Sequence, residues 1–259
     1  MKGWESDFAF YLLQIMALFS ILNYLGLLVC NIHSIALFQS SFLIRITGSN
    51  YQGSFLAYVA TNVCLTAHRL FYTLLPLQAR FILKKSILKA CILSMIAFYI
   101  AYVCFTLTPL ASVVYCPAQI FFYFERRRFL GFIQVMNQVS NFVVGVVNVS
   151  AYTVMFGTLF LKGTLTFTHN NEIRMTLQAA VVSFFELLFF LYWEYGPSSG
   201  LSEFWQRVCD GYSILLYFDV LILPYMISNK SVKSELNKIF SRKRRDSTAK
   251  TWSHPRMPL

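Results

Sequence analysis

The chain has 259 residues, of which 57% are hydrophobic and 17% aromatic, while only 13% are charged. Soluble domains carry about a quarter charged residues, so this composition excludes a soluble globular protein. A bilayer core about 30 Å thick needs roughly 20 apolar residues per helix. The several separate apolar runs therefore predict an all-α membrane protein that crosses the bilayer repeatedly, with no room for a large soluble domain.

The formal charge of +11 at pH 7 is distributed unevenly. Nine of the 22 Lys and Arg residues lie between residues 230 and 256. This pattern favours a tail that contacts anionic membrane lipid or a protein partner, rather than a nucleic-acid-binding surface. The six cysteines show no CxxC or Cys/His spacing, so we expect no metal and no cofactor.

Six apolar runs are expected to cross the membrane within a bundle formed by residues 1–228. In chain order the runs are residues 8–29 (with a continuation to 38 as an alternative), 51–72, 88–107, 132–161, 175–195 and 205–227. Gly48, Ser49 and Asn50 favour a turn in the polar connection 39–50. Residues 229–240 have the pattern of an amphipathic helix on the inner leaflet, and residues 241–259 that of a basic disordered tail.

The distribution of Lys and Arg predicts the orientation of the bundle. If the N-terminus is inside, eight of these residues fall on the inner side before the tail and five on the outer side. The nine tail residues bring the inner side to seventeen. Positive charge is retained in the cytoplasm, so both termini are expected there. The outer triplet Arg126 to Arg128 argues in the opposite direction.

The second run ends on a charged pair. The sequence TNVCLTAHRLFYTLLP, Thr61 to Pro76, contains His68 and Arg69 at the close of the apolar stretch. An arginine is costly in hydrocarbon and is best placed at the membrane interface. The span is therefore expected to end near Arg69, with the following basic loop on the inner side.

Several motifs resemble those of the nematode serpentine chemoreceptors. TAHRLFYTLLP is similar to the inner end of the third helix in that family, with His68 where the family has asparagine. NEIRMTLQAAVVS looks like the start of its sixth helix, and FWQRVCDGYSILL like the outer half of its seventh. PYMISNKSVKSELNKIF resembles the end of the seventh helix in class T and neighbouring classes.

The resemblance implies a rhodopsin-like serpentine helix bundle that holds helices two to seven of the family. It implies a G-protein-coupled chemosensory receptor in the plasma membrane of a sensory cell, with a heterotrimeric G protein and a small-molecule cue as partners. The switch and G-protein-facing residues would be His68, Arg69, Pro76, Tyr225 and Asn229. Such receptors often carry an outer disulfide; here Cys116 in an outer loop has only Cys30 as an outer partner.

Acidic residues within the apolar runs point to a functional site. Glu186 lies near the middle of the fifth run, and Asp210 and Asp219 lie in the sixth. A carboxylate at membrane depth is costly and usually faces the bundle interior. We expect an outer cleft for a small, largely apolar ligand, formed by Tyr58, Glu186, Phe189, Tyr192, Asp210 and Tyr212. The alternatives are structural carboxylates, pairing of Asp210 with Arg207, and aromatic residues that face lipid.

Two other functions remain open. Intramembrane carboxylates also mark ion paths, so a transporter or channel is the main alternative, and an inactive truncated receptor is another. An enzyme is not expected, because the chain has no HExxH, GxSxG or phosphate-loop motif and its four histidines are scattered.

Overall fold

The computed structural model describes residues 4–36, 40–75, 77–79, 83, 85–117, 120–161, 171–196, 200 and 202–228. This part of the chain is mostly helical. Its elements in order are α1 (Trp4–Ile35), α2 (Ser41–Leu74), α4 (Lys85–Leu107), β1 (Val113–Cys116), β2 (Phe121–Phe124), α5 (Leu130–Phe142), the π-helix η1 (Val143–Asn148), α6 (Val149–Leu161), α7 (Asn171–Tyr195) and α8 (Glu203–Ser228). The amphipathic helix and tail expected at 229–259 lie outside the described residues.

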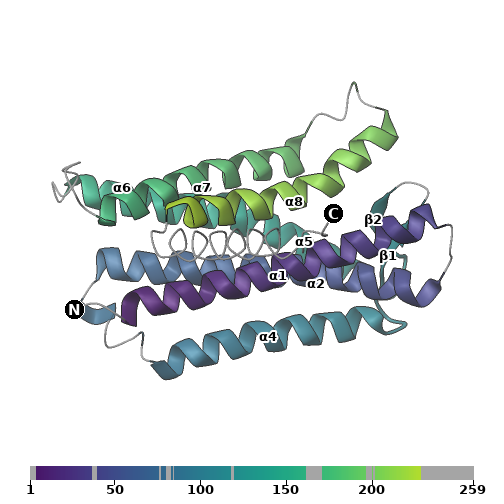
Figure 1. Ribbon diagram of the computed structural model, residues 1–259, viewed down its shortest axis with the longest axis horizontal. Helices are drawn as coiled ribbons and strands as arrows, with labels where there is room; N and C mark the ends of the chain where they lie inside the picture. The colour runs from purple at the N-terminus through teal and green to yellow at the C-terminus, as the bar shows by residue number, and fades with distance from the viewer. Residues whose placement is uncertain are drawn as a thin grey trace, which may run out of the picture.

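The long helices pack along one common direction (Figure 1). Helices α1, α2 and α4 lie side by side, and α6, α7 and α8 run above them in the view. The antiparallel hairpin β1–β2 lies at the end of the bundle that is opposite the N-terminus. The bundle therefore has two distinct ends, one with the hairpin and one with the N-terminus.

Helix α2 occupies the centre of the bundle. It contacts α1, α4, α6, η1 and β1, and every residue from Tyr51 to Val59 is buried. Small residues allow these close contacts: a Cβ added at Gly53 would lie 2.9 Å from the Val103 side chain of α4. Membrane helices use small residues at interfaces in this way. The polar content of α2 is consistent with a helix surrounded by protein.

The turn expected at residues 48–50 is wrong, because α2 is continuous from Ser41 to Leu74. Asn50 uses its polarity for helix packing: its Nδ2 donates to the carbonyl of Leu22 at 2.7 Å, and Tyr99 Oη donates to its Oδ1 at 2.7 Å. Gly48 allows the backbone of Val113 to approach; an added Cβ would lie 2.2 Å from the Val113 carbonyl oxygen. The residues that suggested a turn serve interhelical contacts instead.

The hairpin was not predicted from the sequence. Its four pairs run from Val113 opposite Phe124 to Cys116 opposite Phe121. The Phe122 ring stacks on Tyr51 of α2 with ring centroids 3.9 Å apart. This contact holds the hairpin on the end of α2.

Three helical segments of the described chain are long and apolar enough to cross a membrane, namely Phe8–Ile35, Ser86–Leu107 and Leu130–Thr158. The expectation of a helical membrane protein is thereby supported. Helix α2, with 34 residues, is long enough but more polar. Helices α7 and α8, with 25 and 26 residues, are also long enough, and the side chains of both are described only in part.

Candidate functional site: a buried polar core

Glu186 of α7 is fully buried, with 0% of its surface exposed. Its Oε1 accepts hydrogen bonds from two side-chain amides, Nδ2 of Asn62 on α2 and Nδ2 of Asn148 at the end of η1, the latter at 3.1 Å. Its Oε2 has no hydrogen-bond partner among the described residues. One carboxyl group therefore joins three separate segments of the bundle.

The π-helix η1 places Asn148 beside α7. A π-helix inserts an extra residue into a turn, and such segments frequently occur at functional sites. Gly145 allows close packing, since a Cβ at this position would lie 2.1 Å from the Phe190 ring of α7. Phe190 follows Glu186 by one helical turn, so this contact sets α7 against η1 at the depth of the carboxyl group.

Helix α2 extends the polar core toward the end of the bundle that holds the N-terminus. Thr66 and Arg69 follow Asn62 at helical spacing and reach the Tyr152 hydroxyl of α6 at 3.3 and 3.5 Å, the latter a long contact. The positive charge of Arg69 also acts on Glu186. We use "polar core" for the following six residues: Asn62, Thr66, Arg69, Asn148, Tyr152 and Glu186.

Aromatic rings fill the bundle between the polar core and the hairpin end. The members of this aromatic cluster come from α2, α7 and α8 and are Phe55, Tyr58, Phe189, Trp193, Tyr217 and Phe218. Tyr217 lies at its centre, with ring centroids 5.3 Å from Trp193 and 5.7 Å from Phe189. Tyr217 also interacts electrostatically with Glu186, so the cluster and the polar core adjoin each other.

The residues predicted to line an outer cleft occupy four different places. Tyr58 and Phe189 belong to the aromatic cluster, and Glu186 belongs to the polar core. Tyr192 donates to Asp210 Oδ1 at 3.0 Å, which joins α7 to α8. Tyr212 is 45% exposed.

Two further residues of α8, Arg207 and Asp219, contact other elements of the bundle. The guanidinium of Arg207 lies over the Phe121 ring of the hairpin, 5.5 Å from its centroid. Asp219 accepts a hydrogen bond of 2.6 Å from Tyr24 of α1. Asp219 thus joins α8 to α1 and lies apart from the polar core.

The two predicted switch residues on α2 point to different neighbours. The His68 ring lies between Phe8 of α1 and Tyr72, with centroids 4.9 and 4.7 Å away. Arg69 turns instead toward Tyr152 of α6. Pro76 and Asn229 lie outside the described residues, and Tyr225 is described only as part of the α8 backbone.

Cys30 and Cys116 are free cysteines, so the expected disulfide is not formed. Successive residues of a strand point to opposite faces, and in β1 it is Tyr115 that is buried. The Tyr115 hydroxyl is 3.0 Å from Ser34 Oγ, which joins the hairpin to α1. Burial raises the pKa of Tyr115, so its hydroxyl remains protonated at neutral pH.

Sequence reasoning missed the partners of Glu186, which are Asn62 and Asn148, and also missed Tyr152. Each amide lies inside an apolar run, where a polar side chain needs a partner from another helix. That signal places the residues inside the bundle but does not show which residue each of them bonds.

No protein-family model matches this chain, and no curated protein matches it. The described residues contain no group of three or more His, Cys, Asp or Glu side chains placed to hold a metal ion. The chemistry available at the polar core is hydrogen bonding and proton binding at Glu186.

Proposed function

We propose that the chain is a G-protein-coupled chemosensory receptor of the nematode serpentine type, with α1, α2, α4, α5–α6, α7 and α8 as its membrane-crossing helices. The observation that carries this proposal is the polar core, in which α2, η1, α6 and α7 are held together by directional hydrogen bonds. Such bonds are satisfied in only one relative position of the helices. A bundle joined in this way suits a two-state receptor.

The packing of α2 supports a crossing helix. Its polar side chains find partners inside the bundle: Asn23 of α1, for example, donates to Ser54 Oγ and to the Tyr51 carbonyl, both at 2.9 Å. A helix whose polar groups are satisfied by neighbouring helices can remain in the bilayer despite a moderate hydropathy.

The ligand would act on the aromatic cluster from the outer end. A small apolar molecule that moves Trp193 or Tyr217 would shift α7 and α8 relative to α2, because these rings come from all three helices. The hydrogen bonds of Glu186 to Asn62 and Asn148 would then change. Arg69, next along α2, would leave Tyr152 and contact a G protein at the inner surface.

Replacing Arg69 with alanine tests this proposal. The purified chain in lipid nanodiscs would be mixed with a panel of heterotrimeric G proteins, and nucleotide exchange measured without ligand and with short-chain alcohols and ketones. Loss of a hydrogen-bonding charge worth about 1.5–3 kcal/mol corresponds to a fall in exchange of roughly ten-fold or more. The exposed Arg128→Ala serves as the control and should leave exchange unchanged. Absence of exchange on every G protein would refute receptor coupling.

A transporter is the second candidate, and the buried carboxyl group of Glu186 is the observation that favours it. Recording membrane current in cells that express the chain separates the two functions. A current that depends on the applied compound and is abolished in Glu186→Ala would favour transport, whereas G-protein activation without current favours the receptor.

A further inference from the structure

Glu186 and Asn148 form half of a two-point contact. A carboxylic acid and a primary amide pair through two hydrogen bonds: the amide N–H donates to one acid oxygen, and the acid O–H donates to the amide oxygen. The first bond is present, from Asn148 Nδ2 to Glu186 Oε1 at 3.1 Å. The two atoms needed for the second bond, Glu186 Oε2 and Asn148 Oδ1, are both buried and have no hydrogen-bond partner among the described residues.

Both open atoms are acceptors when Glu186 is ionised, and burying an acceptor without a donor is costly. One proton on Oε2 would supply a donor to Oδ1 and satisfy both atoms at once. We propose that Glu186 is a proton-binding site, protonated at Oε2 in this conformation with its O–H directed at Asn148 Oδ1. The proton comes from water and returns to it when α7 moves away from η1.

Burial disfavours the ionised form of Glu186, and the nearby positive charge of Arg69 opposes this by favouring the ionised form. From α2, Arg69 is the cation that faces the carboxyl group, and its guanidinium is bonded to the Tyr152 hydroxyl. The facing groups of α6 and α8 are the phenols Tyr152 and Tyr217. Helices α5 and η1 contain no charged residue.

The remaining carboxylates near α7 are engaged elsewhere. On α7 itself, Glu194 accepts a bond from Asn141 at 3.0 Å. On α8, Asp210 and Asp219 accept bonds from Tyr192 and Tyr24. The charged side chains of α7 before residue 181 are outside the described set.

A bound metal cation fits these atoms less well than a proton. Hard cations such as Mg²⁺ and Ca²⁺ take about six or more oxygen ligands. Here the amide nitrogens of Asn62 and Asn148 both point their hydrogens at Oε1, so the described oxygens left without a partner around the carboxyl group are the Tyr217 hydroxyl, Oε2 and Asn148 Oδ1, too few for such a cation. A proton needs only Oε2 and Asn148 Oδ1.

Infrared spectroscopy of the full chain in nanodiscs tests the site directly, because a protonated carboxyl group has a carbonyl band that is separate from the carboxylate bands. We expect such a band at neutral pH in the wild type and its loss in Glu186→Gln. The glutamine amide keeps the two-point contact, with an N–H in place of the O–H, so this variant is expected to fold. In Asn148→Leu the band should shift, since the acceptor is removed. A neutral-pH spectrum that is identical in wild type and Glu186→Gln would overturn the proposal.

The part played by this proton in signalling rests on the proposed receptor function. Because Glu186→Gln imitates the protonated form, its G-protein exchange should be low and independent of pH, while wild-type exchange should rise with pH as the carboxyl group ionises. The two failures are distinguishable: the infrared band without any exchange refutes the receptor function and keeps the proton site, whereas exchange without a Glu186 band refutes the proton site alone.

Discussion

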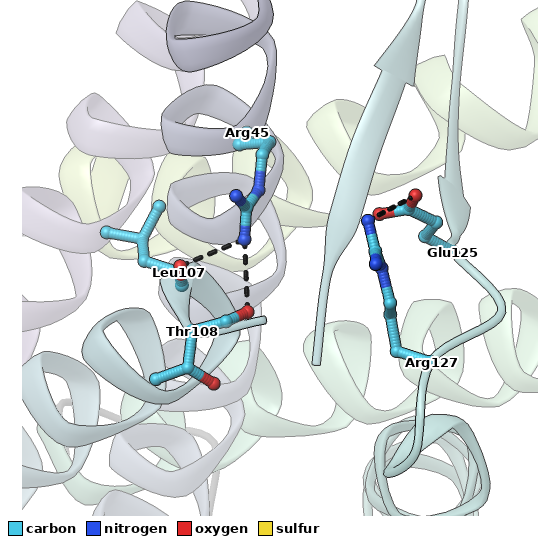
Figure 2. Close-up of polar contacts among 5 residues, drawn as sticks. All are labelled: Arg45, Leu107, Thr108, Glu125 and Arg127. Carbon is cyan, nitrogen blue, oxygen red and sulfur yellow. Dashed lines mark hydrogen bonds and ion pairs between the residues drawn. The ribbon is translucent and has the colours of Figure 1, made fainter. Parts of the chain in front are cut away.

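Two arginines near the hairpin make contacts of similar length in different surroundings (Figure 2). Arg45 of α2 donates from Nη2 to the carbonyls of Leu107 and Thr108 at 2.9 and 3.0 Å. Arg127 pairs with Glu125 at 2.8 Å, but these side chains are 41% and 33% exposed. Arg45 satisfies carbonyl groups at the C-terminal end of α4, where a positive charge is also favoured by the helix dipole.

Arg45→Ala is therefore expected to destabilise the bundle more than Arg127→Ala. Removing Arg45 leaves two helix-end carbonyls without their donor, at a cost of about 1–3 kcal/mol. The exposed pair contributes about 0–1 kcal/mol because water and salt screen it. Denaturant unfolding of the purified chain in detergent measures both free energies. Equal losses for the two variants would contradict the capping role of Arg45.

At the scale of the element, the packing of η1 against α7 should control the polar core. Gly145→Ala places a Cβ 2.1 Å from the Phe190 ring, and overpacking of this kind typically costs about 1–3 kcal/mol. We expect a lower unfolding temperature and a weaker bond between Glu186 and Asn148, seen as a shift of the Glu186 infrared band.

Gly157→Ala in α6 is the matched control, because nothing lies within 4 Å of a Cβ added there. It should leave the stability unchanged or raise it slightly, since alanine favours the helix over glycine. Adding Phe190→Leu to Gly145→Ala should restore part of the lost stability by making room for the methyl group. No recovery in the double variant would mean that the ring is not the source of the clash.

The sequence predicts the helices well and the contacts between them poorly. All six apolar runs are helical in the structure, because hydrophobic length is a strong local signal. The local sequence is misleading at Gly48 to Asn50, which lie inside α2. Small and polar residues of this kind form turns in soluble loops, but in a helix bundle they allow helices to pack closely.

The polar core cannot be predicted from local sequence for a further reason, which is that its residues are far apart along the chain. Asn62 is 124 residues from Glu186, and Asn148 is 38 residues from it. Because a carboxyl group is costly at membrane depth, Glu186 is expected inside the bundle, but this cost does not show which residues bond to it. The apolar run that contains Glu186 places it among the ligand residues of an outer cleft, whereas its hydrogen-bond partners come from two other segments.

For the whole molecule, the number of crossings fixes which parts face each side of the membrane. If only the three most apolar segments cross, residue 75 lies on the side opposite the N-terminus and the hairpin lies on the same side as the N-terminus. If six helices cross, these positions are reversed. The packing favours a crossing by α2, as the proposed six-helix arrangement requires: the start of α2 lies with the end of α4 through Arg45, and 34 residues at about 1.5 Å each carry α2 about 50 Å to the other end of the bundle.

Cysteine labelling in intact cells tests this arrangement. Tyr123→Cys in the hairpin and Leu75→Cys after α2 replace side chains that are 44% and 41% exposed, in a background without the exposed Cys104 and Cys209. With an epitope at the N-terminus as reference, six crossings predict that a membrane-impermeant maleimide reaches residue 123 from the outside. Residue 75 and the epitope should become accessible only after permeabilisation. Labelling of residue 75 from the outside, with an intracellular epitope, would leave α2 outside the bilayer and exclude the serpentine bundle.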